Sequence, residues 1–163
     1  MSGLSVQVLA SDNRVLVTFT EEYDSVVNAH PVADRVLSRW LTQQGLKVLD
    51  QAQVTRIKAR KETQLVLSGD IDAAVAIDLK SDTEWILKGN VTVSSGPRIM
   101  NGQMRPRAAQ IGLTLISTET GVVVYSGHYS SRSAHIDVYS GGEKAIRKAL
   151  KKSYPDILPV LLK

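Results

Sequence analysis

The residues best suited to metal binding or proton transfer are spread along this chain instead of gathering in motifs. The histidines are His30, His128 and His135, and none stands in an HExxH or His-x-His arrangement, so the usual zinc spacing is absent. The chain has no cysteine, which excludes disulfides, thiolate zinc sites and a cysteine nucleophile. We therefore expect no metal site and no cofactor.

Acidic residues form two groups. Asp70, Asp72 and Asp78 share one segment, and a D-x-D spacing can indicate calcium or magnesium, but the loop that would supply further oxygen ligands is missing. We expect Asp70 and Asp72 to cap a helix instead. The second group is predicted to be an exposed acidic patch after a strand, without an identifiable catalytic partner. It consists of Glu21, Glu22 and Asp24.

Motifs for nucleophilic or phosphate chemistry are incomplete. There is no G-x-S-x-G elbow. Gly141-Gly142-Glu143-Lys144 lacks both the Walker spacing and a Ser or Thr after the lysine, so we interpret it as a flexible lead into the last helix, whose N-terminus could hold an anion weakly. We expect no catalytic residues and no small-molecule substrate. A site assembled from distant residues would leave no motif, so an enzyme of unrecognised type stays open.

Two surfaces are candidates for binding macromolecules. The first is the segment 98–107, in which arginine offers several donors and methionine adapts to irregular partners. Its predicted partner-binding residues are Arg98, Met100, Asn101, Met104, Arg105 and Arg107. The alternative is a mobile hairpin tip. The second surface is the basic face of the last helix, which could contact phosphates or could simply be solvated. It comprises Lys144, Arg147, Lys148, Lys151 and Lys152.

Length and composition indicate one globular domain. The 163 residues are 43% hydrophobic and 22% charged, with a formal net charge of +4. We expect a core over 14–163, with 1–13 as an N-terminal extension or hairpin strand. The start has no signal-peptide pattern, and no stretch reaches the roughly 18 apolar residues of a membrane span. The chain is therefore cytoplasmic, or the mature part of an exported protein whose leader is absent.

Alternating apolar residues predict strands at 4–10, 14–20, 46–49, 85–93, 108–117 and 122–131. The segment 21–29 is predicted to be a loop. The pair 108–117 and 122–131 is predicted to form a hairpin, because a short connection containing Gly121 joins them.

Helical spacing of apolar residues predicts four helices. The first follows Pro31, is capped by Asn28 or His30, and ends at Gly45. Its apolar face is Ala33, Val36, Leu37, Trp40 and Leu41. The others run from a cap at Asp50 to about 60, over 70–79, and after 142, with Pro155 and Pro159 breaking the last one. The order predicts a mixed α/β fold: a single mixed sheet of about five to six strands with helices packed on it.

The element order and two local patterns resemble a known group of bacterial domains. One pattern is the step from a helix through Ser81-Asp82 into the strand Trp85-Ile86-Leu87-Lys88-Gly89, and the other is Leu113-Thr114-Leu115 followed by Thr120-Gly121-Val122. The chain resembles the extracytoplasmic domain shared by CsgG, the TolB N-terminal domain, the FlgT middle domain and LpoB. It departs from that group in having Ser81 instead of alanine and two extra residues before Trp85.

The resemblance implies a TolB-N-like scaffold that works without catalysis in the periplasm or at the outer membrane. It implies assembly or accessory roles in secretion, flagellar or cell-wall machinery, through protein partners or self-association. The lack of a lipid-attachment cysteine and of a transmembrane hairpin departs from the anchored, pore-forming members. The alternative is a basic cytoplasmic module that binds nucleic acid, although no RNP or helix-turn-helix signal accompanies the lysines.

Overall fold

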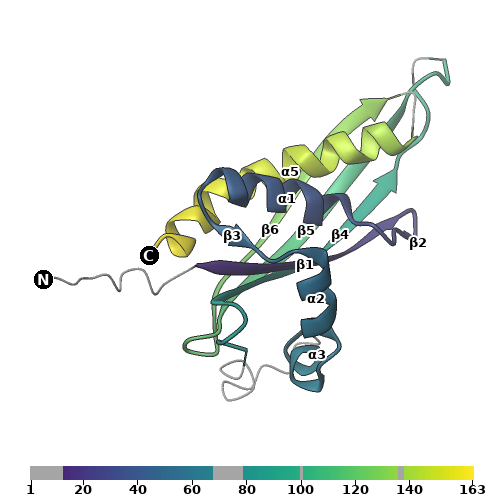
Figure 1. Ribbon diagram of the computed structural model, residues 1–163. Coiled ribbons are helices and arrows are strands. Elements are labelled where there is room, and N and C mark those ends of the chain that lie inside the picture. Colours follow the sequence, from purple (N-terminus) through teal and green to yellow (C-terminus); the bar gives the residue numbers. More distant parts are fainter. Residues whose placement is uncertain (1–12, 68–78, 100, 136–137) are drawn as a thin grey trace, which may run out of the picture.

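The computed structural model describes residues 13–67, 79–99, 101–135 and 138–163. They form one open mixed sheet with helices packed on it (Figure 1). The elements are β1 (Arg14–Tyr23), β2 (Val26–Val27), α1 (Val32–Gln43), β3 (Lys47–Val48), α2 (Gln51–Lys58), α3 (Lys61–Leu67), β4 (Trp85–Ser95), β5 (Arg105–Ser117), β6 (Val122–His135) and α5 (Val138–Leu161). The predicted fold class is confirmed.

The strands follow the order β2-β1-β4-β5-β6, and β3 pairs with the start of β1. β1 and β4 are parallel, from Val15 opposite Trp85 to Tyr23 opposite Val93. A parallel pair needs a crossover connection, and α1, β3, α2 and α3 belong to it. β4, β5 and β6 are antiparallel neighbours.

The predicted hairpin between β5 and β6 is confirmed. Gly121 takes a positive φ of 71°, and its N–H donates to the Ser117 carbonyl at 2.8 Å. Both strands are longer than predicted, because β5 begins at Arg105 and β6 continues to His135. Their outer parts carry mostly polar and small residues, so pairing with a neighbouring strand defines them and an apolar stripe does not.

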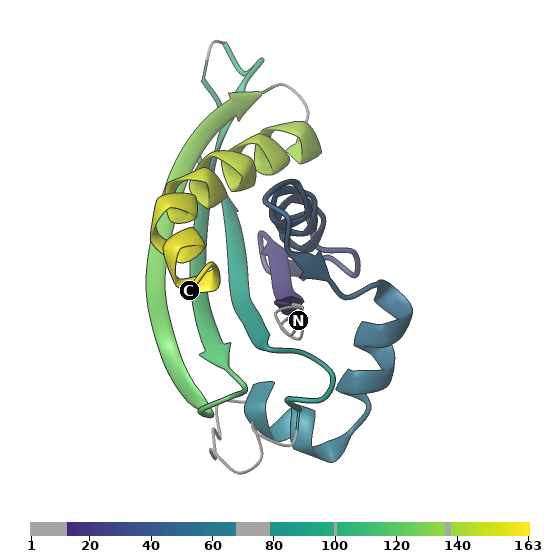
Figure 2. The same cartoon turned by 60° about the vertical axis from the view of Figure 1, so that its left-hand side comes forward.

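The main core lies between the sheet and the helices α1 and α5, which run side by side above it in Figure 1. Figure 2 shows the long strands β4, β5 and β6 curving, with α5 along their inner side. A smaller core joins α2 to the opposite face. Its buried side chains include Leu16, Val54, Ile57, Ile86 and Ile116.

Helix α1 follows the prediction on its apolar face. Ala33, Leu37 and Leu41 are fully buried, and Trp40 stacks on Tyr154 of α5 with ring centroids 3.8 Å apart. Gly45 ends the segment at φ 89°, a conformation that side chains with a Cβ rarely adopt. The prediction for α2 is also confirmed, since the Asp50 carboxylate accepts the Gln53 N–H in a capping box.

The predicted cap of α1 was wrong. Pro31 occupies the N-cap position without a side-chain cap bond. Instead the carboxylate of Glu21, on β1, accepts the N–H groups of Val32 and Ala33 at 3.0 and 3.1 Å and the side-chain amide of Asn28 at 2.7 Å. Free N–H groups and the positive end of the helix dipole stabilise such a carboxylate.

The predicted exposed patch and loop over 21–29 were therefore also wrong in part. Glu21 is fully buried, and β1 continues to Tyr23 before pairing back with β2. Asp24, in the turn, is exposed and accepts hydrogen bonds from the Ser95 N–H and hydroxyl at 2.8 and 2.6 Å. The Ser95 hydroxyl, the Ser95 backbone N–H and the nearby arginines lower the pKa of Asp24.

The last helix starts earlier and ends later than predicted. α5 begins at Val138 and contains Pro155 and Pro159. A proline in a helix interior costs about 3 kcal/mol. Ile157 and Leu161 are fully buried on the main core, and each such side chain contributes about 1.5–3 kcal/mol. This burial offsets the two lost donors, so the helix continues through both prolines.

The remaining expectations fall in part outside the described residues. The expected strand 4–10 lies there, as do positions 70–78 of the expected helix 70–79 and the residues Asp70, Asp72 and Asp78. α3 is an additional helix that periodicity did not predict. Within the described residues, none of the helices has the length and apolar character needed to cross a membrane.

Candidate functional site

The predicted partner-binding segment is the tip of the β4–β5 hairpin, at the upper right of Figure 1. Ile99 and Met104 pair across it, through N–H to carbonyl distances of 2.7 and 3.2 Å. Asn101 and Gly102 turn the chain with φ angles of 57° and 83°. Met100 lies outside the described residues. The segment is thus a hydrogen-bonded turn that projects from the sheet.

Its arginines differ in their availability. Arg107 is 2% exposed and donates to the Arg105 carbonyl at 3.2 Å, so its guanidinium belongs to the interior and not to the surface. Arg105 is half-buried and its Nε donates to the Gly96 carbonyl at 2.9 Å. The other residues of the predicted surface stay a prediction. They are Arg98, Asn101, Met104 and Arg105.

The free edge of β6 can be deduced from the hydrogen-bond pattern. The Gly96 N–H donates to the Pro106 carbonyl at 2.9 Å, so even-numbered residues of β5 point toward β4 and odd-numbered ones toward β6. Odd-numbered residues of β6 lie opposite the latter, for example Ser133 opposite Arg107. The backbone groups of the even-numbered residues of β6 therefore point away from the sheet. These residues are Ser126, His128, Ser130 and Arg132.

Two lysines of α5 cover one half of this edge. Lys152 Nζ donates to the Ser130 carbonyl at 2.6 Å, and Lys148 Nζ donates to the Arg132 carbonyl at 3.4 Å. Lysine at a sheet edge discourages pairing with another strand. In the half formed by residues 122–128, no described side chain makes such a contact. We call residues 122–128 the open half-edge. Its valines are 54, 38 and 40% exposed, at Val122, Val123 and Val124.

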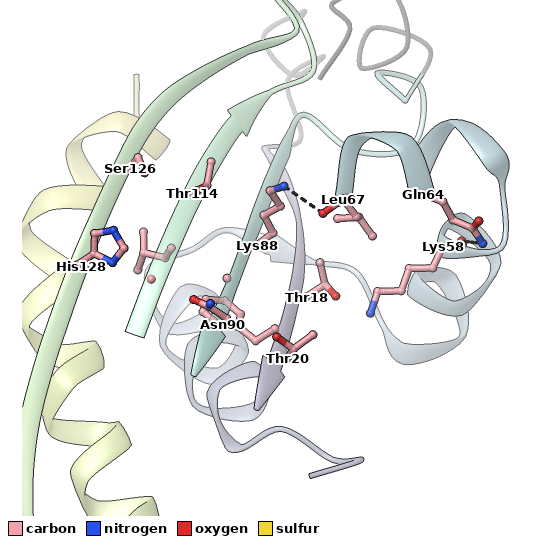
Figure 3. A pocket seen from close by; sticks show the side chains of 14 residues that line it. Thr18, Thr20, Lys58, Gln64, Leu67, Lys88, Asn90, Thr114, Ser126 and His128 are labelled. Atoms are coloured by element: carbon pink, nitrogen blue, oxygen red, sulfur yellow. Dashed lines mark hydrogen bonds between the residues drawn. The ribbon is translucent and has the colours of Figure 1, made fainter. Parts of the chain in front are cut away.

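A polar hollow of about 770 Å³ lies on the sheet face opposite α1 and α5, between the strands and the pair α2 and α3 (Figure 3). Two rows of paired residues cross its floor from β1 to β6. One row is Thr18, Lys88, Thr114 and Ser126, and the other is Thr20, Asn90, Gly112 and His128. Lys58 of α2 and Gln64 of α3 form the opposite wall.

Burial changes the pKa of two groups near this hollow. Lys88 Nζ donates to the Leu67 carbonyl at 3.1 Å, and loss of water lowers its pKa. Asp34, on α1, has one buried oxygen (Oδ1) without a hydrogen-bond partner. Burial raises the pKa of Asp34 to about 6, against the opposing effects of Lys58 and the Phe19 backbone.

Sequence analysis missed the hollow. Its signal is the alternation in which Thr18 and Thr20, and likewise Lys88 and Asn90, occupy every second position of a strand. We interpreted such positions only as the solvated side of each strand. Only the strand order and register show that the polar positions of four strands form two continuous rows.

The other candidate motifs do not form a site. Positions 128 and 135 are an odd number of residues apart on one strand, so they belong to opposite faces of the sheet. His30 is exposed beside the start of α1. Gly141 and Gly142 lie inside α5, which corrects the predicted flexible lead. A Cβ at position 142 would lie 2.6 Å from the Tyr23 ring, so this glycine allows close packing of α5 on β1.

Comparison with known proteins identifies the fold. The chain matches no family model and no curated protein sequence. It is similar to the crystal structure of the lipoprotein GNA1162 from Neisseria meningitidis, with 17% identity and a TM-score of 0.52 over 88% of this chain and 98% of that one. It is also similar to the hypothetical protein CT253 from Chlamydia trachomatis, with 8% identity and a TM-score of 0.52 over 90% and 94% of the two chains.

The C-terminal domain of LpoB from Salmonella enterica matches over 76% of this chain and 89% of that domain, with 20% identity and a TM-score of 0.42. A TM-score this low carries no argument. At these identities the similarities show a shared fold and nothing more. The fold is that of a bacterial lipoprotein, which confirms the coarser part of the expected resemblance but does not single out CsgG, TolB or FlgT.

Proposed function

We propose that this chain is a non-enzymatic accessory or assembly domain of the bacterial envelope that binds a protein partner along the open half-edge of β6. The fold shared with the lipoprotein GNA1162 supports the envelope location. The single observation that carries the binding role is the contrast along β6. Lysines cover the carbonyls of one half, whereas the other half presents outward backbone groups beside exposed valines.

The occupant that fits this edge is an extended segment of a partner protein, added as a further strand. Ser126 and His128 each offer an outward N–H and C=O, and a paired backbone hydrogen bond contributes about 1 kcal/mol net. Val122, Val123 and Val124 provide apolar contacts for alternate side chains of the partner. Lys148 and Lys152 lie beyond them, so the partner segment carries acidic residues at that end.

The basic face of α5 supports the nucleic-acid alternative less well. Lys148 and Lys152 contact β6, and Arg147 pairs with Glu143 at 2.9 Å. Intramolecular contacts therefore occupy three of the five basic side chains that motivated the alternative.

The proposal can be tested with a photo-crosslinking amino acid placed at position 124 or, as a control, at position 132, in bacteria that produce the protein natively. We expect a discrete crosslinked product from position 124 only. Ser126→Pro removes an outward N–H without breaking a β5–β6 bond, and should reduce that product about tenfold. Ser130→Pro is the matched control, because its N–H points the same way on the lysine-covered half.

A product of twice the monomer mass, together with a dimer in light scattering, would show that a second copy is the occupant and would replace the partner protein in the proposal. Absence of a product from position 124, or equal loss with both proline variants, would refute binding at the open half-edge. Arg98→Glu tests the predicted hairpin surface in the same assay. An unchanged product would remove Arg98 from the partner surface.

A further inference from the structure

We propose that the polar hollow is a binding site for a small hydroxylated anion, such as a sugar that carries a phosphate or a carboxylate. Its volume of about 770 Å³ is in the range of small-molecule sites. Its polar lining consists of hydroxyl, amide, ammonium and imidazole groups, and no carboxylate belongs to it among the described residues. Hydroxyls and amides match a polyol, which both donates and accepts hydrogen bonds.

The floor of the hollow depends on a glycine. A Cβ at Gly112 would lie 2.7 Å from the Asn90 Oδ1 and 3.3 Å from the His128 ring. Asn90 and His128 therefore converge above position 112 from the two neighbouring strands. A ligand resting on this floor has an amide on one side and an imidazole on the other, as Figure 3 shows.

Positive charge faces the same space from two elements. Lys88 rises from the centre of β4, and Lys58 reaches in from α2 on the opposite wall (Figure 3). Because Lys88 is partly desolvated, an anion in the hollow would replace the solvation that its ammonium group has lost. The charged group nearest to Lys58 is Asp34, which does not line the hollow. The ammonium of Lys58 can therefore serve a ligand and Asp34 from opposite sides.

The site does not depend on the proposed protein interface. Lys58 and Gln64 lie on the wall away from β6, so a change there leaves the open half-edge intact. Loss of ligand binding with retained crosslinking at position 124, or the reverse, would separate the failure of one proposal from the failure of the other.

The experiment is a titration of the ¹⁵N-labelled protein with glucose 6-phosphate and with glucuronate, using neutral glucose and inorganic phosphate as separate controls. We expect concentration-dependent shifts at the amides of Asn90, Gly112 and His128 with at least one hydroxylated anion. The shifts should require several-fold higher concentrations of glucose or phosphate alone. Which of the two anions binds more tightly distinguishes a phosphate from a carboxylate ligand.

Two pairs of variants test the position of the site. Lys58→Gln should weaken binding about tenfold, whereas Lys151→Gln, which removes the same charge from the exposed face of α5, should leave it unchanged. Gly112→Ala should abolish binding while the protein stays folded, because the new methyl meets only side-chain ends.

Three outcomes would overturn the proposal. The first is no shift at the three amides with either anion up to about 20 mM. The second is equal weakening by Lys58→Gln and Lys151→Gln, which would indicate surface electrostatics alone. The third is unchanged binding in Gly112→Ala with a folded spectrum.

Discussion

The buried carboxylate of Asp34 should make the stability of this protein fall as the pH rises from about 4 to about 6. Burial raises the pKa of Asp34 from 3.8 to about 6 in the folded protein, and one of its oxygens has no hydrogen-bond partner. Between these values the unfolded chain has already lost the proton that the folded protein still holds. Ionisation therefore favours the unfolded state, and the full loss is reached above the folded pKa.

The difference between 3.8 and about 6 corresponds to about 3 kcal/mol of stability. Because Asp34 is only partly buried and remains partly hydrated, we expect about 1–2 kcal/mol. Asp34→Asn keeps the shape and the acceptor for the Phe19 backbone but cannot ionise. It should raise the free energy of unfolding by about 1–2 kcal/mol above about pH 7 and change it little near about pH 4.

The assay is urea denaturation of both proteins, followed by circular dichroism, at intervals from about pH 4 to about pH 8. The comparison at low pH is the internal control, because both side chains are then neutral. A constant difference between the two proteins at every pH would refute the reasoning, as would a lower stability of Asp34→Asn at neutral pH.

Three further predictions concern the packing that positions the candidate sites. Glu21→Gln removes the buried charge at the start of α1 and should cost about 2 kcal/mol in urea denaturation, and no loss would mean that backbone solvation replaces this cap. Gly89→Ala should destabilise by about 3 kcal/mol or more, since its Cβ would lie 2.3 Å from the Gly112 carbonyl and 2.5 Å from the Phe19 ring. A normal thermal midpoint in that variant would contradict this contact. Asp50→Ala should cost about 1 kcal/mol through loss of the α2 capping box, and a loss above about 3 kcal/mol would indicate a larger role than capping.

Local patterns predicted the elements whose signals lie within a few residues. Spacing of apolar residues and the terminal Gly45 predicted α1, and the Asp50 cap predicted α2. The turn at Gly121 predicted the β5–β6 hairpin. These signals are local because capping bonds, positive φ angles and helical periodicity all act within one or two turns of chain.

Local rules were insufficient where a distant partner supplied the decisive interaction. Pro155 and Pro159 predicted a broken helix, but burial of Ile157 and Leu161 against the sheet keeps α5 continuous. The run containing Glu21 predicted a solvated patch, but the N-terminus of α1 folds onto it. In both regions the energy from tertiary packing exceeds the local preference.

The sequence by itself determined the class of this protein: a mixed sheet with amphipathic helices and a set of polar strand positions. Tertiary structure alone decided which of those positions meet. Register aligns Thr20, Asn90, Gly112 and His128 across four strands, and the path of α5 places Lys148 and Lys152 over one half of β6 and leaves the other half open. Alternation along a strand assigns a residue to a face, but only strand order and register, which depend on contacts between distant segments, assign its neighbours.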